Sequence, residues 1–330
     1  MAMEQRVLGR TGAKLSVLGF GCGAVGGLMV RGSAADQERA VARALELGIN
    51  FLDTAAAYGN GESEKNLGRV LKTLRPQIFL STKFTVLPED RGRIGAAVAA
   101  SLDASLKRLG REQVDLLQLH NRVARDGRDR ALDADIVLSE VVPALEALRQ
   151  QGKIRFFGIT GLGETPDLHR VVDARVLDTV QVCYNLLNPS AGGALPQGLP
   201  GQDFAGLLDR AQAAGMGTIG IRVLAGGALS GAETRHPLGV QTLEPIASGA
   251  DYRTDVAHAK KFEALVRKGH GRSIIEAALR FAITNKAMTT VLVGYSTIEQ
   301  LEYAASCINK GPLSAAALGD LAALWRGFAA

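Results

Sequence analysis

The stretch INFLDTAAAYGNGESEKNLGRVLKTLRPQIFLSTKF at positions 49–84 contains the unit from which this chain is built. An apolar run at 49–53 is followed by a segment with helical spacing at 63–73 and by a second apolar run at 78–83. Ile49, Phe51 and Leu52 dominate the first run and Ile78, Phe79 and Leu80 begin the second, and short apolar runs of this kind are typical of parallel strands buried on both faces. The stretch therefore predicts a strand–helix–strand unit.

The same alternation continues in both directions along the chain. It predicts eight strands, over 16–20, 49–53, 78–83, 114–120, 154–160, 179–185, 217–223 and 289–294. It predicts the intervening helices over 36–47, 63–73, 92–109, 137–151, 165–174, 203–214, 256–267 with 273–285, and 297–308. Strict alternation at this count favours an α/β fold, a single (β/α)8 TIM-barrel domain over residues 1–330, rather than an open doubly wound sheet. The first strand is not followed by the Gly-x-Gly-x-x-Gly turn of a Rossmann domain.

Both ends of the chain add to this pattern. Residues 6–8 and 14–21 flank the turn signal at 9–12, and together they predict an N-terminal β-hairpin. The closing segment LSAAALGDLAALWRGFAA at 313–330 predicts a helix that packs on the outside of the barrel.

Three connections are longer than is usual between barrel elements, at 121–136, 186–202 and 224–252. All three follow strands, so we expect them on the C-terminal face, where barrel enzymes keep their active sites. The connection at 186–202 is rich in Gly and Pro and is interpreted either as a lid or as an ordered surface loop. The charge run at 122–130 favours a solvated loop over an anion site.

Composition excludes several classes of protein. The 330 residues carry 38 Lys and Arg against 33 Asp and Glu, a net charge of +5 without any dense basic block, and only 5% are aromatic, which disfavours nucleic-acid binding. The scattered Cys22, Cys183 and Cys307 do not suit a disulfide framework or an organising zinc site. The opening residues do not resemble a signal peptide, and no apolar run has the ~18 residues of a membrane span. We expect a cytoplasmic protein without a membrane partner.

Four reactive side chains lie at or just beyond the ends of successive predicted strands: Asp53, Tyr58, Lys83 and His120. Each has a structural explanation when taken alone, because an Asp can cap a helix, a Tyr can pack, and a Lys or His can lie at a rim. Neighbouring strands of a barrel are also neighbours in space. The four side chains are therefore expected to meet at one mouth of the barrel.

The chemistry of these four groups is complementary. A phenol with its ordinary pKa near 10 is a poor proton donor at neutral pH. A neighbouring ammonium lowers that pKa, a carboxylate holds the ammonium in place, and a histidine can hydrogen-bond a carbonyl oxygen. This set suits the protonation of an oxygen while the attached carbon receives another group. Without a metal cluster or nucleophile motif in the sequence, the natural donor to that carbon is the hydride of a nicotinamide.

Several motifs resemble the aldo-keto reductase superfamily, with some likeness to its sugar-dehydrogenase branch. They are NFLDTAAAYGNGESEKNLGRVL at 50–71, STKF at 81–84, DLLQLH at 115–120, GKIRFFGIT at 152–160 and QVCYN at 181–185. The likeness spans nearly the whole chain and implies an (α/β)8 barrel that reduces carbonyl groups with NADPH and without a metal.

The resemblance also implies a role for each candidate. Tyr58 would donate the proton, Lys83 would adjust its pKa, Asp53 would pair with Lys83, and His120 would orient the carbonyl group. The implied cofactor contacts are Gly21, Cys22, Gly23, Asp53, Thr160, Gly161, Gln181, Arg222, Leu224, Gly226, Gly294, Ser296, Thr297 and Gln300.

The nicotinamide end of this cofactor site departs from the family pattern. Gln181 stands where the family bonds the nicotinamide amide, but positions 160–161 are Thr-Gly in place of a typical Ser-Asn pair. Positions 221–222 are Ile-Arg in place of the more usual Tyr-Ser, so a stacking aromatic ring is absent there. Tyr184 is a candidate to replace that ring. The diphosphate is expected near Leu224 and Gly226.

The adenosine end is expected at the exit of the last strand. Ser296–Glu299 has the pattern of a capping box, whose amides suit a phosphate, although capping alone explains the motif as well. Many family members bind the 2′-phosphate of NADP here with Lys or Arg, whereas positions 287–309 contain neither. NADP(H) is implied by the resemblance, NAD(H) is a serious alternative, and Arg introduced at Thr297 is expected to favour NADPH.

The sequence thus predicts an NAD(P)(H)-dependent oxidoreductase that reduces aldehydes or ketones to alcohols. One alternative is an NAD-dependent sugar or aldose dehydrogenase that uses the same site in the oxidative direction. A second, of another class, is a cofactor-binding regulatory subunit. The expected partner is a small carbonyl compound or sugar, while the particular substrate and the oligomeric state are left open.

Overall fold

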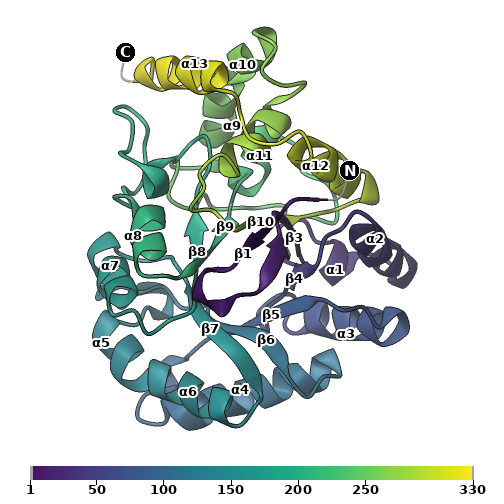
Figure 1. Ribbon diagram of the computed structural model, residues 1–330, viewed down its shortest axis with the longest axis vertical. Coiled ribbons are helices and arrows are strands. Elements are labelled where there is room, and N and C mark those ends of the chain that lie inside the picture. Colours follow the sequence, from purple (N-terminus) through teal and green to yellow (C-terminus); the bar gives the residue numbers. More distant parts are fainter. Residues whose placement is uncertain (1–2, 329–330) are drawn as a thin grey trace.

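The computed structural model describes residues 3–328, in which eight parallel strands close into a barrel (Figure 1). These strands are β3 (Leu18–Gly21), β4 (Phe51–Asp53), β5 (Phe79–Phe84), β6 (Val114–Leu119), β7 (Ile154–Thr160), β8 (Thr179–Cys183), β9 (Gly217–Ile221) and β10 (Thr290–Gly294). Each strand pairs with the next in the chain, and β10 closes the ring against β3, with Val291 opposite Leu18. The predicted (β/α)8 barrel is confirmed.

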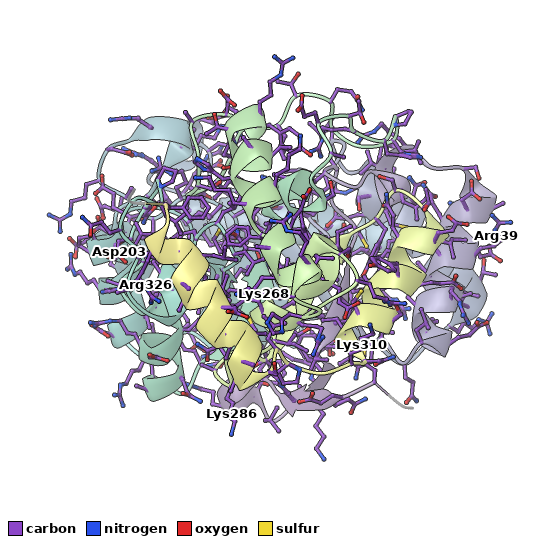
Figure 2. The ribbon with its side chains drawn as sticks, turned by 90° about the horizontal axis from the view of Figure 1, so that it is seen from above. Arg39, Asp203, Lys268, Lys286, Lys310 and Arg326 are labelled. Atoms are coloured by element: carbon purple, nitrogen blue, oxygen red, sulfur yellow. The ribbon has the colours of Figure 1, made fainter. Side chains whose placement is uncertain are left out.

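Helices surround this ring (Figure 1). They are α1 (Leu28–Arg31), α2 (Ala34–Glu46), α3 (Glu62–Leu74), α4 (Ile94–Leu109), α5 (Ala134–Ile136), α6 (Val142–Gln150), α7 (Thr165–Asp173), α8 (Leu207–Ala213), α9 (Tyr252–Lys261), α10 (Glu263–Arg267), α11 (Ile274–Ala282), α12 (Ile298–Ile308) and α13 (Ala315–Arg326). Helix α13 lies on the outside, where Lys268 binds its Asp320 at 2.6 Å (Figure 2). None of the helices in residues 3–328 is long and apolar enough to cross a membrane.

The N-terminal hairpin is present, but its second strand is shorter than predicted. Strand β1 (Gln5–Val7) pairs antiparallel with β2 (Lys14–Ser16), whereas residues 18–21 form the separate barrel strand β3. The chain changes sheets at Val17, whose N–H donates to Glu4 while its carbonyl accepts from Val291. A continuous strand over 14–21 was therefore a wrong prediction, because its two halves have partners in different sheets.

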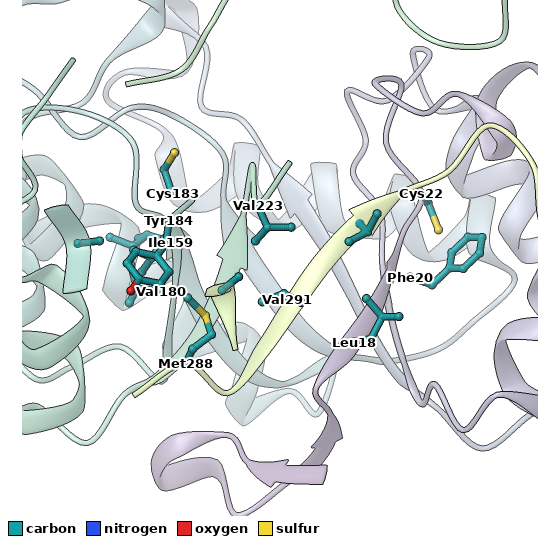
Figure 3. Close-up of a cluster of buried hydrophobic side chains, with 14 of the residues drawn as sticks. Leu18, Phe20, Cys22, Ile159, Val180, Cys183, Tyr184, Val223, Met288 and Val291 are labelled. Carbon is teal, nitrogen blue, oxygen red and sulfur yellow. The ribbon is translucent and has the colours of Figure 1, made fainter. Parts of the chain in front are cut away.

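Side chains along each barrel strand alternate between the lumen and the helices. Apolar side chains from the hairpin and four strands fill the lower lumen: Leu8, Leu15, Phe51, Phe79, Leu116 and Ile219. Further along the same rows the positions become polar, as in Asp53, Lys83 and Gln118. On β3 the opposite, outward row carries Leu18 and Phe20 and continues into Cys22; all three join the core between strands and helices (Figure 3).

Three predicted boundaries differ from the structure because of backbone conformation. Strand β9 ends at Ile221, two residues early, since Arg222 has a φ of 54° that turns the chain out of the sheet. Helix α8 begins at Leu207 because Ala205 and Gly206 both have left-handed backbones. The helix predicted over 137–151 begins earlier, at α5, and contains a π-helical turn before α6.

Candidate active site

A cavity of about 460 Å³ opens at the C-terminal end of the barrel. Strand ends and the loops that follow them form most of its lining, with residues of α9, α11 and α12 completing it. This is expected for a barrel with its longest connections on this face. Of the residues proposed from the sequence, the cavity is lined by Gly21, Gly23, Asp53, Tyr58, His120, Thr160, Gln181, Arg222, Leu224, Gly226, Gly294, Ser296 and Gln300.

Tyr58 reaches the cavity from a tight turn between β4 and α3. Gly59, Asn60 and Gly61 all have positive φ, so the chain reverses sharply directly after the tyrosine. A Cβ atom at Gly59 would lie 2.5 Å from Cγ1 of Val30, and the left-handed backbone adds to the cost of any side chain there. The local sequence Tyr-Gly-Asn-Gly thus fixes the direction of the phenol.

Asp53, Lys83 and Tyr58 form a continuous polar chain. Lys83 Nζ forms a buried ion pair with Asp53 Oδ1, donates to the carbonyl of Thr54 at 2.8 Å, and lies 3.2 Å from the Tyr58 hydroxyl. The Lys83 side chain is 1% exposed and does not line the cavity itself. It therefore acts on the cavity through its neighbours, above all through Tyr58.

Burial is the largest single influence on the pKa values of Tyr58 and Lys83. Burial raises the pKa of the Tyr58 phenol, and the Lys83 ammonium acts against that rise. Burial acts to lower the pKa of Lys83, but Asp53 and Tyr58 outweigh it, so this pKa lies above its ordinary value. Lys83 is consequently charged and Tyr58 protonated at neutral pH.

His120 directly follows β6 and packs against the Tyr58 ring. Its ring centroid lies 5.7 Å from that of Tyr58, with the planes nearly perpendicular at 83°. Burial, followed by the charge of Lys83, lowers the pKa of His120 to about 3. The imidazole is neutral over the physiological range and can donate one N–H to an oxygen in the cavity.

Gln181 lies on β8 and lines the cavity beside Asp53. Its Nε2 donates to Asp53 Oδ2 at 3.2 Å, and its Oε1 accepts from the Thr160 hydroxyl at 3.4 Å. An ionised carboxylate only accepts hydrogen bonds, so Asp53 determines which end of this amide faces it. Gly161 cannot supply a further side chain, because a Cβ there would lie 2.4 Å from the Gln181 carbonyl oxygen.

Arg222 brings a cation to the cavity at the end of β9. Its left-handed backbone is uncommon for a residue other than glycine, and its guanidinium has no hydrogen-bond or carboxylate partner among residues 3–328. Burial lowers the pKa of this group. A largely buried guanidinium without an acceptor is suited to an anionic ligand.

The connection after β9 crosses the cavity as a strap formed by residues 232–241. Arg31 Nε donates to the carbonyl of Leu238 at 2.6 Å, which ties the strap to the end of α1. Arg235 lines the cavity, but its guanidinium bonds the backbone carbonyls of Val25, Gly226 and Val240. Its donors are thus engaged by the protein itself.

The start of α12 differs from the predicted capping box by one residue. The N-cap is Thr297, whose hydroxyl accepts from Gln300 N–H, while Gln300 Oε1 accepts from Ser296 N–H at 2.8 Å. Hydrogen bonds to its own N–H and to the Thr297 hydroxyl lower the pKa of Glu299. The helix is capped by Thr297 rather than Ser296, so the capping box Ser296–Glu299 was a wrong prediction; Glu299 does not line the cavity.

Besides Lys83, four residues named from the sequence as cofactor contacts lie outside the cavity lining: Cys22, Gly161, Tyr184 and Thr297. Cys22 is buried and belongs to the outward row of its strand. Tyr184 stacks on Phe281 with ring centroids 4.8 Å apart, so it does not replace the missing aromatic ring. Thr297 is engaged as a helix cap.

Sequence reasoning missed the cations that α2 brings towards α12. Arg43 pairs with Glu302 of α12 at 2.6 Å and also with Glu46, while Arg39 pairs with Asp36. These residues lie some 260 positions away in the chain, so a local motif could not indicate them. Within residues 3–328 no group of His, Cys, Asp and Glu is arranged to hold a metal ion.

Comparison with known proteins agrees with this geometry. The model of the aldo/keto reductase family matches residues 17–326. The chain is 34% identical over 308 residues to L-galactose dehydrogenase of Arabidopsis thaliana, covering 91% of this chain and 86% of that protein. It is 32% identical over 225 residues to D-threo-aldose 1-dehydrogenase of a Pseudomonas species, covering 59% and 66%.

Solved structures show the same relationship. The holo form of an aldo-keto reductase from Bacillus halodurans superposes with a TM-score of 0.72 and 25% identity, covering 98% of this chain and 96% of that one. With a closed barrel, a family match over nearly its whole length and a cavity at the C-terminal face, this chain belongs to the aldo/keto reductase family of nicotinamide-dependent oxidoreductases.

Proposed function

We propose that this protein reduces an aldehyde or ketone to an alcohol by hydride transfer from a nicotinamide cofactor, with Tyr58 as the general acid. The observation that carries the proposal is the Tyr58 hydroxyl, which faces the cavity 3.2 Å from the Lys83 ammonium and beside the neutral imidazole of His120. The Tyr58 hydroxyl can donate a proton to a ligand in the cavity, and the Lys83 ammonium can stabilise the phenolate that remains.

The residues of the cavity fit a dinucleotide. Gln181 offers its amide at the catalytic end, and the unpartnered guanidinium of Arg222 suits the diphosphate. Leu224 and Gly226 line the same stretch of the cavity, and Ser296 and Gln300 line it at the exit of β10. The cofactor supplies hydride to the carbonyl carbon; the protein positions the carbonyl group and moves the proton.

Each protein group has one task in this scheme. His120 donates its N–H to the carbonyl oxygen and orients it towards Tyr58. As the carbon gains hydride, the C=O π bond opens and the oxygen takes the proton of the Tyr58 hydroxyl. The resulting phenolate lies beside Lys83, whose charge stabilises it until solvent returns a proton. Asp53 holds Lys83 in position.

The same site favours a second candidate, the NAD-dependent oxidation of an aldose. The motivating observation is Glu299, a carboxylate in the first turn of α12, whose charge would repel a 2′-phosphate bound at this helix start. Relatives that carry the names L-galactose dehydrogenase and D-threo-aldose 1-dehydrogenase point the same way. In this direction Tyr58 accepts the hydroxyl proton of the sugar.

Turnover assays decide among these functions. Purified protein is assayed with each reduced cofactor against a panel of aldehydes and ketones, and with each oxidised cofactor against a panel of aldoses. Reduction with a catalytic efficiency above that of oxidation supports the first proposal, and the reverse supports the second. Binding of cofactor without turnover of any compound would instead favour a regulatory subunit.

A further inference from the structure

Gln118 lies in the barrel lumen directly beneath the polar chain of the active site. It is buried with no exposed surface on β6, two residues before His120. Its Nε2 lies 3.3 Å from Asp53 Oδ2 and 2.9 Å from Ser81 Oγ. It does not line the cavity, so a direct contact with substrate or cofactor is not its role.

The orientation of this amide leaves one atom without a partner. Because the ionised Asp53 carboxylate accepts but does not donate, the amide must turn its NH2 group towards it. Gln118 Oε1 is then buried with no hydrogen-bond partner in residues 3–328. A buried acceptor without a partner costs about 1–3 kcal/mol. An orphaned acceptor next to a candidate catalytic group calls for a compensating role for the NH2 group.

We propose that Gln118 is a positioning residue for the Asp53–Lys83–Tyr58 chain, which fixes the Asp53 carboxylate in its ionised form and directs Oδ1 at Lys83. This inference rests on the proposed function of Tyr58. Asp53 Oδ1 is occupied by Lys83, and Oδ2 receives the two amides of Gln118 and Gln181. Gln181 also borders the cavity, whereas Gln118 serves Asp53 and Ser81 alone.

The charge of Asp53 depends on several neighbours. Burial raises the pKa of Asp53, and Lys83 acts against this rise together with hydrogen bonds from Ser81 and Gln118. The other titratable groups that face this chain are Tyr58 and Cys22, and His120 faces Lys83 from the end of β6. Within residues 3–328 none of these forms a hydrogen bond with Oδ2, which receives the amides of Gln118 and Gln181. Loss of this donor should make Asp53 easier to protonate.

Gln118→Met tests the proposal, because methionine keeps the length of the side chain and removes both the donor and the orphaned acceptor. We expect kcat to fall about tenfold, as for a lost hydrogen bond to a charged group. The affinity for the cofactor should change less than about twofold, since no cavity contact is altered. The acidic limb of the pH profile of kcat should move to higher pH, because protonated Asp53 no longer holds Lys83.

Two further variants separate positioning from packing. Gln118→Glu can donate a proton to Asp53 only while protonated, so its kcat should approach that of the wild type at low pH and fall further behind as pH rises. Gln113→Met, at an exposed glutamine just before β6, should leave kcat and the pH profile unchanged. Wild-type kcat and an unshifted acidic limb in Gln118→Met would overturn the proposal.

A readout without turnover keeps this inference distinct from the proposed function. The carboxyl carbon of Asp53, labelled with ¹³C and assigned with Asp53→Asn, is titrated by NMR in the wild type and in Gln118→Met. A higher pKa of Asp53 in the variant supports the positioning role, and an unchanged pKa refutes it. If the wild type reduces no carbonyl compound, the proposed function fails while this titration still decides the role of Gln118.

Discussion

Tyr58 is a proton donor whose acidity is set by two opposing effects. The sequence predicted the meeting of Asp53, Tyr58, Lys83 and His120, because neighbouring strands of a barrel place their ends together. It also predicted that Lys83 lowers the pKa of the phenol, whereas burial outweighs Lys83 in the structure. The motif identifies the groups but not the depth at which they lie. Burial depends on the whole barrel, and therefore its effect on the pKa could not be predicted from the sequence.

Removal of the Lys83 charge should shift the pH dependence of reduction. Reduction requires protonated Tyr58, so activity falls on the basic side as the phenol ionises. Without the ammonium the pKa of Tyr58 rises further, and the basic limb moves to higher pH in Lys83→Met, while kcat falls about 10²-fold or more. The measurement is the pH profile of kcat with a saturating aldehyde.

A second variant separates this effect from the cost of an unpaired charge. Lys83→Met leaves the buried carboxylate of Asp53 without its partner, which is destabilising in itself. Asp53→Asn/Lys83→Met removes both charges and keeps the packing. Both variants should show a basic limb displaced to higher pH, by less in the double variant, because the Asp53 charge also raises the pKa of Tyr58. A limb at its wild-type position in the double variant would recast Lys83 as a residue that only supports the fold.

At the scale of single elements, the start of α12 shows how a shift of one residue changes a functional interpretation. Both Ser296 and Thr297 can cap a helix, and the sequence pattern pointed to Ser296. The structure places the N-cap at Thr297, which engages Thr297 and leaves Gln300 on the cavity. Cys22 provides a similar case. Successive residues of a strand face the lumen and the helices in turn, and Cys22 faces the helices.

A cation for the 2′-phosphate should therefore be introduced at Gln300 rather than at Thr297. Gln300→Arg is expected to tighten NADPH binding about tenfold and to leave NADH nearly unchanged, given the screening of an exposed site. Dissociation constants for both cofactors provide the measurement. Gln300→Met is the matched control, since it removes the bond to Ser296 N–H without adding charge.

Arg222→Gln tests the predicted contact with the diphosphate, as Gln300→Arg tests the contact with the 2′-phosphate. The diphosphate is common to both cofactors, so this change should weaken NADH and NADPH alike, by about tenfold for a charge-assisted contact. A wild-type preference for NADPH above about a hundredfold would contradict the proposal that the 2′-phosphate lacks a cation here, because that ratio corresponds to nearly 3 kcal/mol.

At the scale of the whole molecule, the alternation of apolar runs and helical segments was sufficient to predict the barrel. Parallel strands buried on both faces leave a strong signal, and eight of them leave few other arrangements. The long connections leave no such signal. The strap at 232–241 is held by Arg31 and Arg235 through backbone carbonyls, which any sequence provides. Its course over the cavity could not be predicted for that reason.

The buried carboxylate of Glu276 links α11 to the segment that follows α12 through ion pairs. Glu276 of α11 is 1% exposed and contacts Arg272, Arg280 and Lys310, the last at 2.8 Å from beyond α12. Burial acts to raise the pKa of Glu276, but its cationic partners lower it to about 2. The native state therefore favours the ionised form more strongly than the unfolded chain does.

The difference between the pKa of Glu276 in the folded protein and its ordinary value in the unfolded chain makes its contribution to stability depend on pH. It is fully present above the ordinary glutamate pKa and is lost as pH falls towards about 2. Glu276→Gln should lower the free energy of unfolding by about 2 kcal/mol at pH 7, and by much less near pH 3. Urea unfolding at the two pH values measures the difference. Glu263→Gln, which breaks an exposed pair with Arg267 at 3.5 Å, should cost less than about 1 kcal/mol.

The measurement that tests the central claim most directly is single-turnover reduction by Tyr58→Phe. The phenyl ring keeps the packing against His120 and removes only the hydroxyl, so cofactor affinity should stay within about twofold of the wild type. The rate of hydride transfer should fall by about 10²–10⁴-fold, the usual contribution of a general acid. A variant that retains more than about a tenth of the wild-type rate would show that another group donates the proton.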